Sequence, residues 1–276
     1  MISVNLTTTY SRLELCAATV WSFYNQLVMP DVINLWVSKE KYLADDGITV
    51  IPEWVAELNT IKNIIKVNFT TNTGPYRKVI PVLRAAKDED IIVYADDDVI
   101  YGRAWLAGLL KTYHANGGNL VVASRIRLKK KNIFGKYKSY NLYPLQNSNT
   151  ILEKDFIITG IGGCILSRKH ILESLLVLDD YMNVAPKTDD IWISKLIELS
   201  GTSVYAYADG IPTVNEIEHS NNALNISNTV RFVHNNIMVR LAGKILAAVT
   251  GYFGCCLSNN DKMIRNVDNF FKNHKK

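Results

Sequence analysis

The sequence predicts an α/β fold built on a mainly parallel, mixed sheet with helices on both faces. Two observations support this expectation. Apolar runs of strand length alternate with stretches of helical periodicity, and three consecutive aspartates directly follow one of these runs. The 276 residues are 48% hydrophobic, so the chain can bury a substantial core, which excludes a disordered or fibrous protein.

The first part of the chain alternates strands and helices. Four β-rich runs predict strands at residues 2–6, 32–38, 64–70 and 90–95. Between the strands, apolar spacing predicts helices at residues 13–26, 53–61 and 75–87. Pro75 suits a first helical turn, whereas Pro81 should kink or shorten the last of these helices.

The next part is expected to continue with a helix at residues 104–118, ended by its glycines, and a strand at residues 119–128. A glycine-rich segment, TGIGGCILSRKHI, then precedes a helix, and residues 185–201 place a second acidic pair at a helix start. No internal repeat or low-complexity linker is present in the sequence. We therefore expect one domain over residues 1–235 and a helical tail over residues 236–276.

The stretch VYADDDVIYG places Asp96, Asp97 and Asp98 at the end of a predicted strand. A solvated acidic turn is the simple alternative, but open α/β sheets bind ligands beyond the carboxyl ends of their strands. Carboxylates spaced as Asp-x-Asp suit Mg²⁺ or Mn²⁺, which bind through one or two such groups together with substrate phosphates. A metal there would also relieve the mutual repulsion of the three aspartates.

Six motifs in order resemble those of nucleotide-sugar-dependent glycosyltransferases of the GT-A fold, similar to bacterial family 2 enzymes: TTTYSR, NLWVS, NTGPYRKVIPVL, YADDDVIYG, TGIGGCILS and APKTDDIWIS. The resemblance covers roughly the first 200 residues. It implies a Rossmann-like GT-A domain with a Mn²⁺ or Mg²⁺ cofactor. It also implies inverting sugar transfer from a nucleoside diphosphate donor, with a UDP-sugar favoured, to a glycan or lipid-linked glycan in surface polysaccharide biosynthesis.

The resemblance also implies roles for single residues. Asp96 and Asp97 would face the ribose and base, and Asp98 would hold the metal, with Asp96 and His219 as further metal candidates. The other donor-site candidates are Thr8, Tyr10, Arg12, Asn72, Lys78, Arg125, Gly162 and Gly163.

Several of these candidates have structural alternatives. Thr8 could cap a helix or shape a turn, and Lys78 could be a solvated helix lysine, with Arg77 beside it as a second phosphate candidate. Asn72 stands where the family usually has an acidic residue, which leaves the base of the donor open. Glycines allow close approach of a ligand, but Gly162 and Gly163 could equally form a tight structural turn.

The second acidic pair, Asp189 and Asp190, matches the family's motif at a helix start. An inverting transfer needs one carboxylate to take the proton of the acceptor hydroxyl, and we assign this role to Asp190 with Asp189 as the second candidate. Alternatively, the two acids stabilise the helix N-terminus.

Residues 125–138 carry seven basic and no acidic side chains, and the formal net charge of the chain is +5. No nucleic-acid-binding motif accompanies them, so no nucleic acid is expected; an acidic glycan, a lipid pyrophosphate, an anionic membrane or a solvated loop remain open. The apolar stretch 245–257 with flanking Arg240 and Lys244 suits a helix on a membrane surface, or one packed on the domain or in a dimer.

The compartment is expected to be the cytoplasm, with peripheral contact to a membrane. The N-terminus has no signal-peptide pattern, and the four cysteines show neither a CxxC spacing nor a disulfide framework.

Two other functions remain open. One is a sugar-nucleotide nucleotidyltransferase, although its Gly- and Arg-rich loop is missing after the first strand, and the other is a non-catalytic basic binding module.

Overall fold

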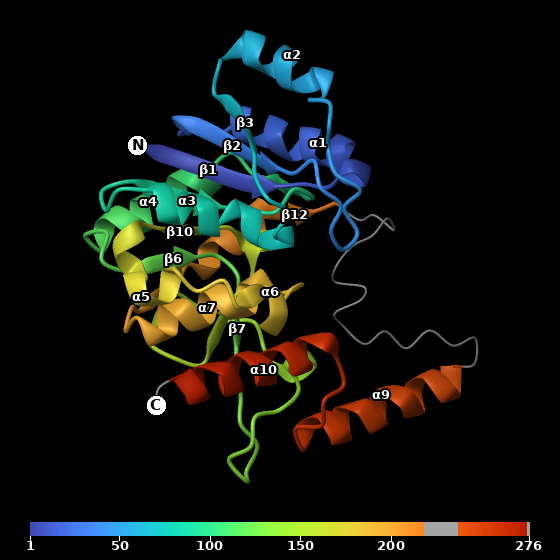
Figure 1. Cartoon of the computed structure of the whole chain (residues 1–276). Coiled ribbons are helices and arrows are strands. Elements are labelled where there is room, and N and C mark those ends of the chain that lie inside the picture. Colours follow the sequence, from blue (N-terminus) through green and yellow to red (C-terminus); the bar gives the residue numbers. More distant parts are fainter. Residues whose placement is uncertain (218–236, 275–276) are drawn as a thin grey trace.

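The computed structural model describes residues 1–217 and 237–274 (Figure 1). Its central sheet has the strand order β3-β2-β1-β4-β10-β6-β11-β8. The strands are β1 Ile2–Thr7, β2 Val32–Val37, β3 Ile65–Phe69, β4 Ile91–Tyr94, β6 Val121–Ala123, β8 Thr150–Leu152, β10 Cys164–Leu166 and β11 Val204–Ala206. The pairs β1–β2, β2–β3, β1–β4 and β6–β11 are parallel, whereas β10 is antiparallel to both β4 and β6, and β8 to β11. The predicted mainly parallel, mixed sheet is confirmed.

Helices cover both faces of this sheet. The helices are α1 Leu13–Tyr24, α2 Glu53–Ile61, α3 Ile80–Ala85, α4 Trp105–Ala115, α5 Glu173–Leu176, α6 Tyr181–Val184, α7 Asp189–Leu199, α9 Ile237–Tyr252 and α10 Asn259–His274. Short 3-10 turns are η1 Tyr10–Arg12, η2 Gly74–Lys78, η3 Tyr140–Leu142, η4 Gly160–Gly162, η5 Arg168–His170 and η6 Ala208–Thr213.

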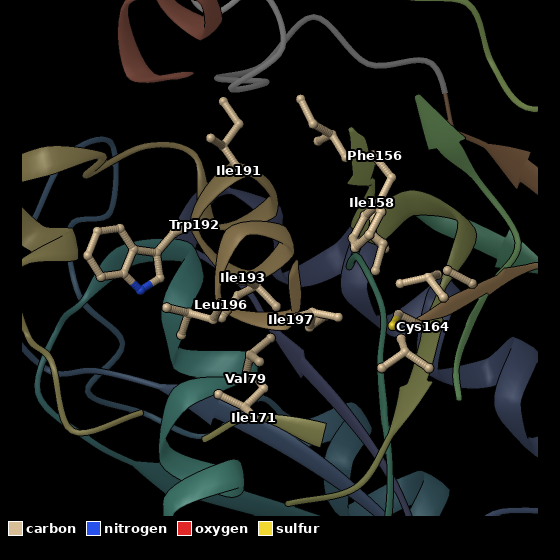
Figure 2. Packing of buried hydrophobic residues seen from close by; sticks show 14 of the residues in the cluster. Val79, Phe156, Ile158, Cys164, Ile171, Ile191, Trp192, Ile193, Leu196 and Ile197 are labelled. Atoms are coloured by element: carbon tan, nitrogen blue, oxygen red, sulfur yellow. The ribbon is translucent and has the colours of Figure 1, made fainter. Parts of the chain in front are cut away.

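The two faces of the sheet have separate cores because side chains of a strand alternate between them. On β4, Val93 packs with residues of α1 and α4, whereas Ile92 and Tyr94 pack with residues of α3 and α7. Figure 2 shows part of this second core, in which Leu196 of α7 lies near Val79 and Ile171.

Two small sheets lie beside the central one: β5 Val99–Tyr101 pairs with β12 Val214–Glu216, and β7 Ile126–Leu128 pairs with β9 Phe156–Ile158. The single strand expected over residues 119–128 is therefore wrong. After β6 the chain leaves the central sheet, since Arg125 accepts a backbone hydrogen bond from Thr159 and the following residues pair with β9.

The helix expected over residues 75–87 is also divided, into η2 and α3. Pro75 lies in the first turn of η2 and Pro81 in the first turn of α3, where the missing N–H of a proline removes no helical hydrogen bond.

The tail divides into two helices with different surroundings. Met263, Ile264, Val267 and Phe271 of α10 are buried in the core that contains α7, whereas α9 lies at the edge of the molecule (Figure 1). The boundary expected near residue 235 falls outside the described residues. Within residues 1–217 and 237–274, no helix has the length and apolar character needed to cross a membrane.

Candidate active site

A cavity of about 340 Å³ opens beyond the carboxyl ends of β1 and β4. Thr7, which ends β1, lies in its wall with Thr8 and Thr9, and the three aspartates follow β4. Much of the remaining wall comes from residues 42–45, 74–78 and 187–191, together with the base of the segment between β7 and β8. The cavity thus lies where the parallel strands end, as expected for a ligand site in such a sheet.

Basic side chains compensate the charge of the aspartate cluster. Arg12 forms ion pairs with Asp97 and with Asp98, the latter with 2.8 Å between Nη2 and Oδ2. Lys78 Nζ lies 2.6 Å from Asp96 Oδ1. Burial raises the pKa of Asp97 to about 6, although the neighbouring Arg12 guanidinium opposes this shift. The ion pairs with Arg12 and Lys78 therefore allow three adjacent carboxylates to lie close together.

Lys78 also joins the two acidic motifs. Its ammonium lies 3.1 Å from Asp189 Oδ2 as well as 2.6 Å from Asp96. Burial favours the neutral amine, but the carboxylates of Asp189 and Asp96 outweigh it and raise the pKa of Lys78 well above its usual value. A protonated lysine therefore lies between the end of β4 and the start of α7.

Asp190 lies on the glycine-rich side of the cavity. Its Oδ1 accepts a hydrogen bond of 3.0 Å from the backbone N–H of Gly160. Burial and the adjacent Asp189 raise the pKa of Asp190 well above its usual value. A Cβ on Gly160 would lie 2.5 Å from Asp96 Oδ1, so only glycine allows this backbone to approach both acidic motifs.

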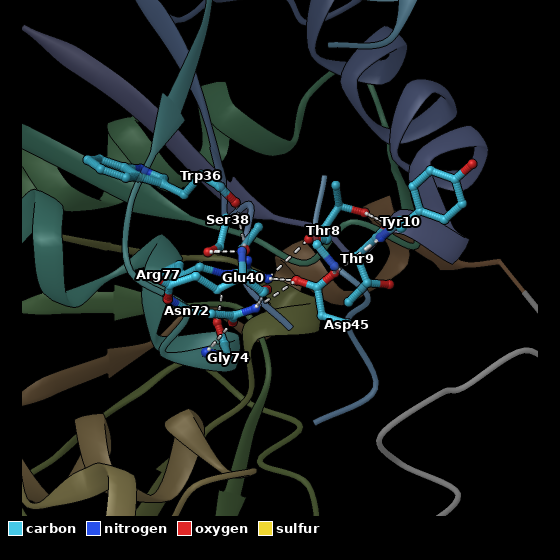
Figure 3. Close-up of polar contacts among 12 residues, drawn as sticks. Thr8, Thr9, Tyr10, Trp36, Ser38, Glu40, Asp45, Asn72, Gly74 and Arg77 are labelled. Carbon is cyan, nitrogen blue, oxygen red and sulfur yellow. Dashed lines mark hydrogen bonds and ion pairs between the residues drawn. The ribbon is translucent and has the colours of Figure 1, made fainter. Parts of the chain in front are cut away.

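A second polar cluster lies between the loop after β1 and the turn before η2 (Figure 3). Arg77 is buried, pairs with Asp45 at 2.8 Å and donates to the backbone oxygens of Thr8 and Gly74. Asn72 donates to the backbone oxygen of Glu40 and to Asp45. These contacts hold the segment around Asp45 against the cavity.

Some buried polar atoms of cavity-lining residues have no hydrogen-bond partner within the described residues: Arg12 Nε, Arg77 Nη1, Asp97 Oδ2 and Thr188 Oγ1. Buried polar groups are normally paired, so unpaired ones around a cavity are typical of a site that receives a polar ligand.

A search with protein-family models matches residues 6–176 to the family described as Glycosyl transferase family 2. The chain belongs to glycosyl transferase family 2. The predicted family and the predicted glycosyltransferase activity with a nucleotide-sugar donor are thereby confirmed. A search of curated proteins found no match.

Several solved structures resemble this family 2 enzyme. The mannosyltransferase PcManGT from Pyrobaculum calidifontis, in complex with GDP-Man and Mn²⁺, is 15% identical with a TM-score of 0.49, over 97% of this chain and 68% of that one. S. aureus TarS is 15% identical with a TM-score of 0.46, over 76% and 58%. Its complex with UDP is 16% identical with a TM-score of 0.46, over 75% and 57%. The chain thus spans less than two thirds of the TarS chains.

The structure of the family 2 enzyme brings most predicted site residues to the cavity. Those in its wall are Thr8, Arg12, Lys78, Asp96, Asp97, Asp98, Arg125, Asp189 and Asp190. The solvated position considered for Lys78 is wrong, because this side chain is buried between two carboxylates.

The other predicted residues lie away from the cavity or outside the described residues. Asn72 is buried behind the wall, and the ring of Tyr10 is exposed and points away from Asp45 (Figure 3). A Cβ on Gly162 would meet Arg125, and one on Gly163 would meet the ring of Trp105, so both glycines serve close packing. His219 lies outside the described residues.

Sequence reasoning missed several cavity residues of this enzyme, including Asp45, Tyr140, Glu216 and Asn260. Asp45 belongs to a loop without a periodic pattern. Glu216 comes beside the aspartates because β12 pairs with β5, opposite Val99. None of these positions belongs to a recognisable motif. The only local sign of a site residue is that Asp45 is an acidic residue two places before Gly47.

The carboxylates fit the metal that the family implies. Asp96 and Asp98 both reach the cavity, and hard carboxylate oxygens of this kind hold Mg²⁺ or Mn²⁺ together with a diphosphate. Among the described residues, no group of three or more His, Cys, Asp and Glu side chains could hold a metal ion alone.

Proposed function

We propose that this enzyme transfers a sugar, with inversion, from a nucleoside diphosphate donor to a hydroxyl of a glycan or lipid-linked glycan during surface polysaccharide synthesis. UDP is the nucleotide that we favour. The observation that carries the proposal is the arrangement of two acidic motifs in one cavity, linked by the buried Lys78.

The first motif suits the donor. We propose that Asp97, which has an unpaired buried oxygen among the described residues, accepts a hydrogen bond from a hydroxyl of the ribose. We also propose that Asp98 with Asp96 holds Mn²⁺ or Mg²⁺. When bound, the metal would neutralise the diphosphate and make it a better leaving group. Arg12 and Lys78 would supply further positive charge beside the phosphates.

The second motif suits the acceptor. In the proposed step, the acceptor oxygen forms a bond with the anomeric carbon, the bond from that carbon to the diphosphate oxygen breaks, and the acceptor proton passes to Asp190. The raised pKa of Asp190, caused by burial and by Asp189, makes it a stronger base than an ordinary carboxylate. The amide of Gly160 orients this carboxylate.

The donor half is tested by thermal unfolding with UDP, GDP, dTDP or CMP, each with and without Mn²⁺. A ligand at about 100 times its Kd should add about 2.7 kcal/mol to the free energy of unfolding. We expect one diphosphate to stabilise the wild type only with Mn²⁺, and Asp98→Ala to abolish this effect. Asp46→Ala, a change at an exposed aspartate, is the matched control and should retain it. Absence of stabilisation by every nucleotide would overturn the proposal.

We further propose that the enzyme works in the cytoplasm, in peripheral contact with a membrane. Support comes from the exposed apolar side chains of α9 and from the basic segment 125–138.

A further inference from the structure

The helix α9 turns its small residues toward the protein and its large apolar residues outward, which is the reverse of an ordinary packed helix. Gly243, Ala247 and Gly251 recur every four residues and share one face, which is partly or fully buried. A Cβ on Gly251 would meet Ser139 and Leu142 near η3, so this face packs closely on the domain. The small residues of α9 therefore face the protein.

The large apolar residues of α9 point the other way. Leu241, Ile245 and Val249 of α9, and Phe253 directly after it, also recur every four residues. Each is more than half exposed, as is the neighbouring Leu246. A helix that packs on a protein core normally buries its larger apolar side chains. The exposed face of α9 consequently has the composition of a surface that contacts a membrane or another protein.

A hairpin-like loop between β7 and β8 extends this apolar face. Its tip exposes Ile133 at 82% and Phe134 at 65%, and Phe134 stacks on Phe253 with 6.2 Å between ring centroids. Asn132 Nδ2 donates to the backbone oxygen of Tyr252 at 3.0 Å. In Figure 1 this loop and α9 both lie beyond α10, away from the central sheet. We call the exposed side of α9 with residues 130–136 the apolar rim.

The charge around the apolar rim is positive. Lys130, Lys131 and Lys136 are exposed on the loop, and Lys244 is exposed on α9. Residues 125–138 and 237–258 contain no aspartate or glutamate. Exposed apolar side chains among lysines are typical of a surface that lies in the headgroup region of an anionic bilayer.

The loop that carries part of the apolar rim begins at the wall of the active-site cavity. Arg127 and Tyr140, at the base of the same loop, line the cavity, and so does Asn260 at the start of α10. Asp261 of α10 accepts hydrogen bonds from Ser139 and from the backbone N–H of Tyr140, which connects the loop to the helix. An acceptor anchored in the bilayer beneath the rim would need to extend only along this loop to reach the cavity.

We propose that the apolar rim docks the enzyme on an anionic lipid surface, with Ile133, Phe134 and the exposed face of α9 inserted among the headgroups. The enzyme would thereby take an acceptor anchored in that surface. The docking surface stands on the geometry and charge above, whereas the anchored acceptor rests on the proposed function.

Flotation of the full-length protein with vesicles tests the docking surface. We expect binding to equimolar phosphatidylcholine and phosphatidylglycerol to exceed binding to phosphatidylcholine alone at least about a hundredfold, because lysines near an anionic surface each strengthen binding about fivefold. Lys130→Gln with Lys131→Gln and Lys136→Gln should weaken binding to the mixed vesicles about a hundredfold.

A double variant tests the apolar part. Phe134→Ser with Leu246→Gln should weaken binding to the mixed vesicles about tenfold or more, because it removes two inserted side chains. Ile61→Gln, a change at an equally exposed apolar residue on α2, should leave binding unchanged. All variants should keep the wild-type melting temperature and the stabilisation by nucleotide, since they change exposed side chains outside the cavity.

Three results would overturn the docking surface: no binding to either vesicle, equal binding by the double variant and the wild type, or a dimer that Leu246→Gln dissolves. The last result would make a second copy of the chain the partner of α9. Nucleotide stabilisation is measured on the same samples, so a failure of the proposed function and a failure of the docking surface would be seen separately.

Discussion

The aspartates of the first motif are each paired with a basic side chain from a different part of the chain. Arg12 comes from the turn after β1, and Lys78 comes from the end of η2. Unpaired carboxylates at these burial levels would be costly, so the pairs stabilise the site before any ligand arrives. A donor diphosphate with its metal would bind beside these same aspartates and basic side chains.

The two acids of the second motif should differ in their mutant kinetics. Asp190→Asn is expected to lower kcat by about 10²–10⁴-fold, since it removes the proposed base, while stabilisation by the nucleotide and Mn²⁺ persists. Asp189→Asn removes a partner of Lys78 and should weaken donor binding as well. Equal kcat for Asp190→Asn and the wild type would contradict the assignment.

The acid limb of the pH–rate profile should reflect the raised pKa of Asp190. The base must be ionised, so the rate should fall with decreasing pH at values above those of an ordinary carboxylate. Asp189→Asn should move this limb to lower pH, because the negative charge of Asp189 is one cause of the shift. The measurement is kcat/KM against pH for both proteins.

His170 gives a separate prediction about stability. It is buried, its Nδ1 accepts from the backbone N–H of Ser167 at 2.9 Å, and burial lowers its pKa to about 4. The unfolded chain therefore takes up this proton first as the pH falls below about 6.5. The stabilisation is present above that value, and about 3 kcal/mol is lost by pH 4.

His170→Asn keeps an acceptor near the same position but does not titrate. Urea denaturation at pH 7 and pH 4 should show that the wild type loses about 3 kcal/mol more than the variant between these values. The comparison with the variant isolates His170 from the buried carboxylates, whose raised pKa values act in the opposite direction. Equal losses in the two proteins would refute the assignment.

At the scale of elements, the start of α10 holds the loop before η3. The carboxylate of Asp261 accepts hydrogen bonds from Ser139, from the backbone of Tyr140 and from the backbone of Leu257 and Ser258. One buried side chain thus orders both the helix N-terminus and the base of the loop that carries the apolar rim.

Replacement of Asp261 should therefore be costly. Asp261→Ala is expected to lower the free energy of unfolding by about 2–4 kcal/mol, because it leaves several buried donors unpaired. Asp46→Ala, at an exposed ion pair, should change it by less than about 0.5 kcal/mol. Chemical denaturation of both variants provides the measurement.

At the scale of the whole molecule, the tail completes a core that the first part of the chain leaves open. Phe271 of α10 is buried and lies 5.0 Å from Trp192 of α7 between ring centroids. The helix α10 is therefore docked on the domain. The three possibilities that the sequence left open concern residues 245–257, which precede α10. The adjoining α9 keeps its large side chains exposed.

Two phenylalanines of the tail test this difference. Phe271→Ala should destabilise the protein by about 3–5 kcal/mol because it opens a cavity in the core. Phe253→Ala, at a half-exposed position on the apolar rim, should cost about 1 kcal/mol or less. Similar losses for both would mean that α9 is also part of the packed core.

Much of the fold and the two acidic motifs of the site could be predicted, because they depend on short stretches of sequence. β-Branched runs and helical periodicity identified most elements between Ile2 and Leu199, and the aspartates after β4 were recognisable because they follow a strand directly. The prediction of a single strand over residues 119–128 was wrong because the second part of this stretch pairs with β9. This partner lies about 30 residues later in the chain, and no local pattern specifies it.

By itself, the sequence determined the alternating α/β order, the family and the two acidic motifs, since each is encoded by neighbouring residues. Only the tertiary structure decided that Lys78 joins these motifs, that Asp45 and Glu216 enter the cavity, and that α9 turns its small residues inward. These features depend on contacts between segments distant in the chain. Such contacts are set by how sheet, helices and loops pack together, and not by the local periodicity of any one segment.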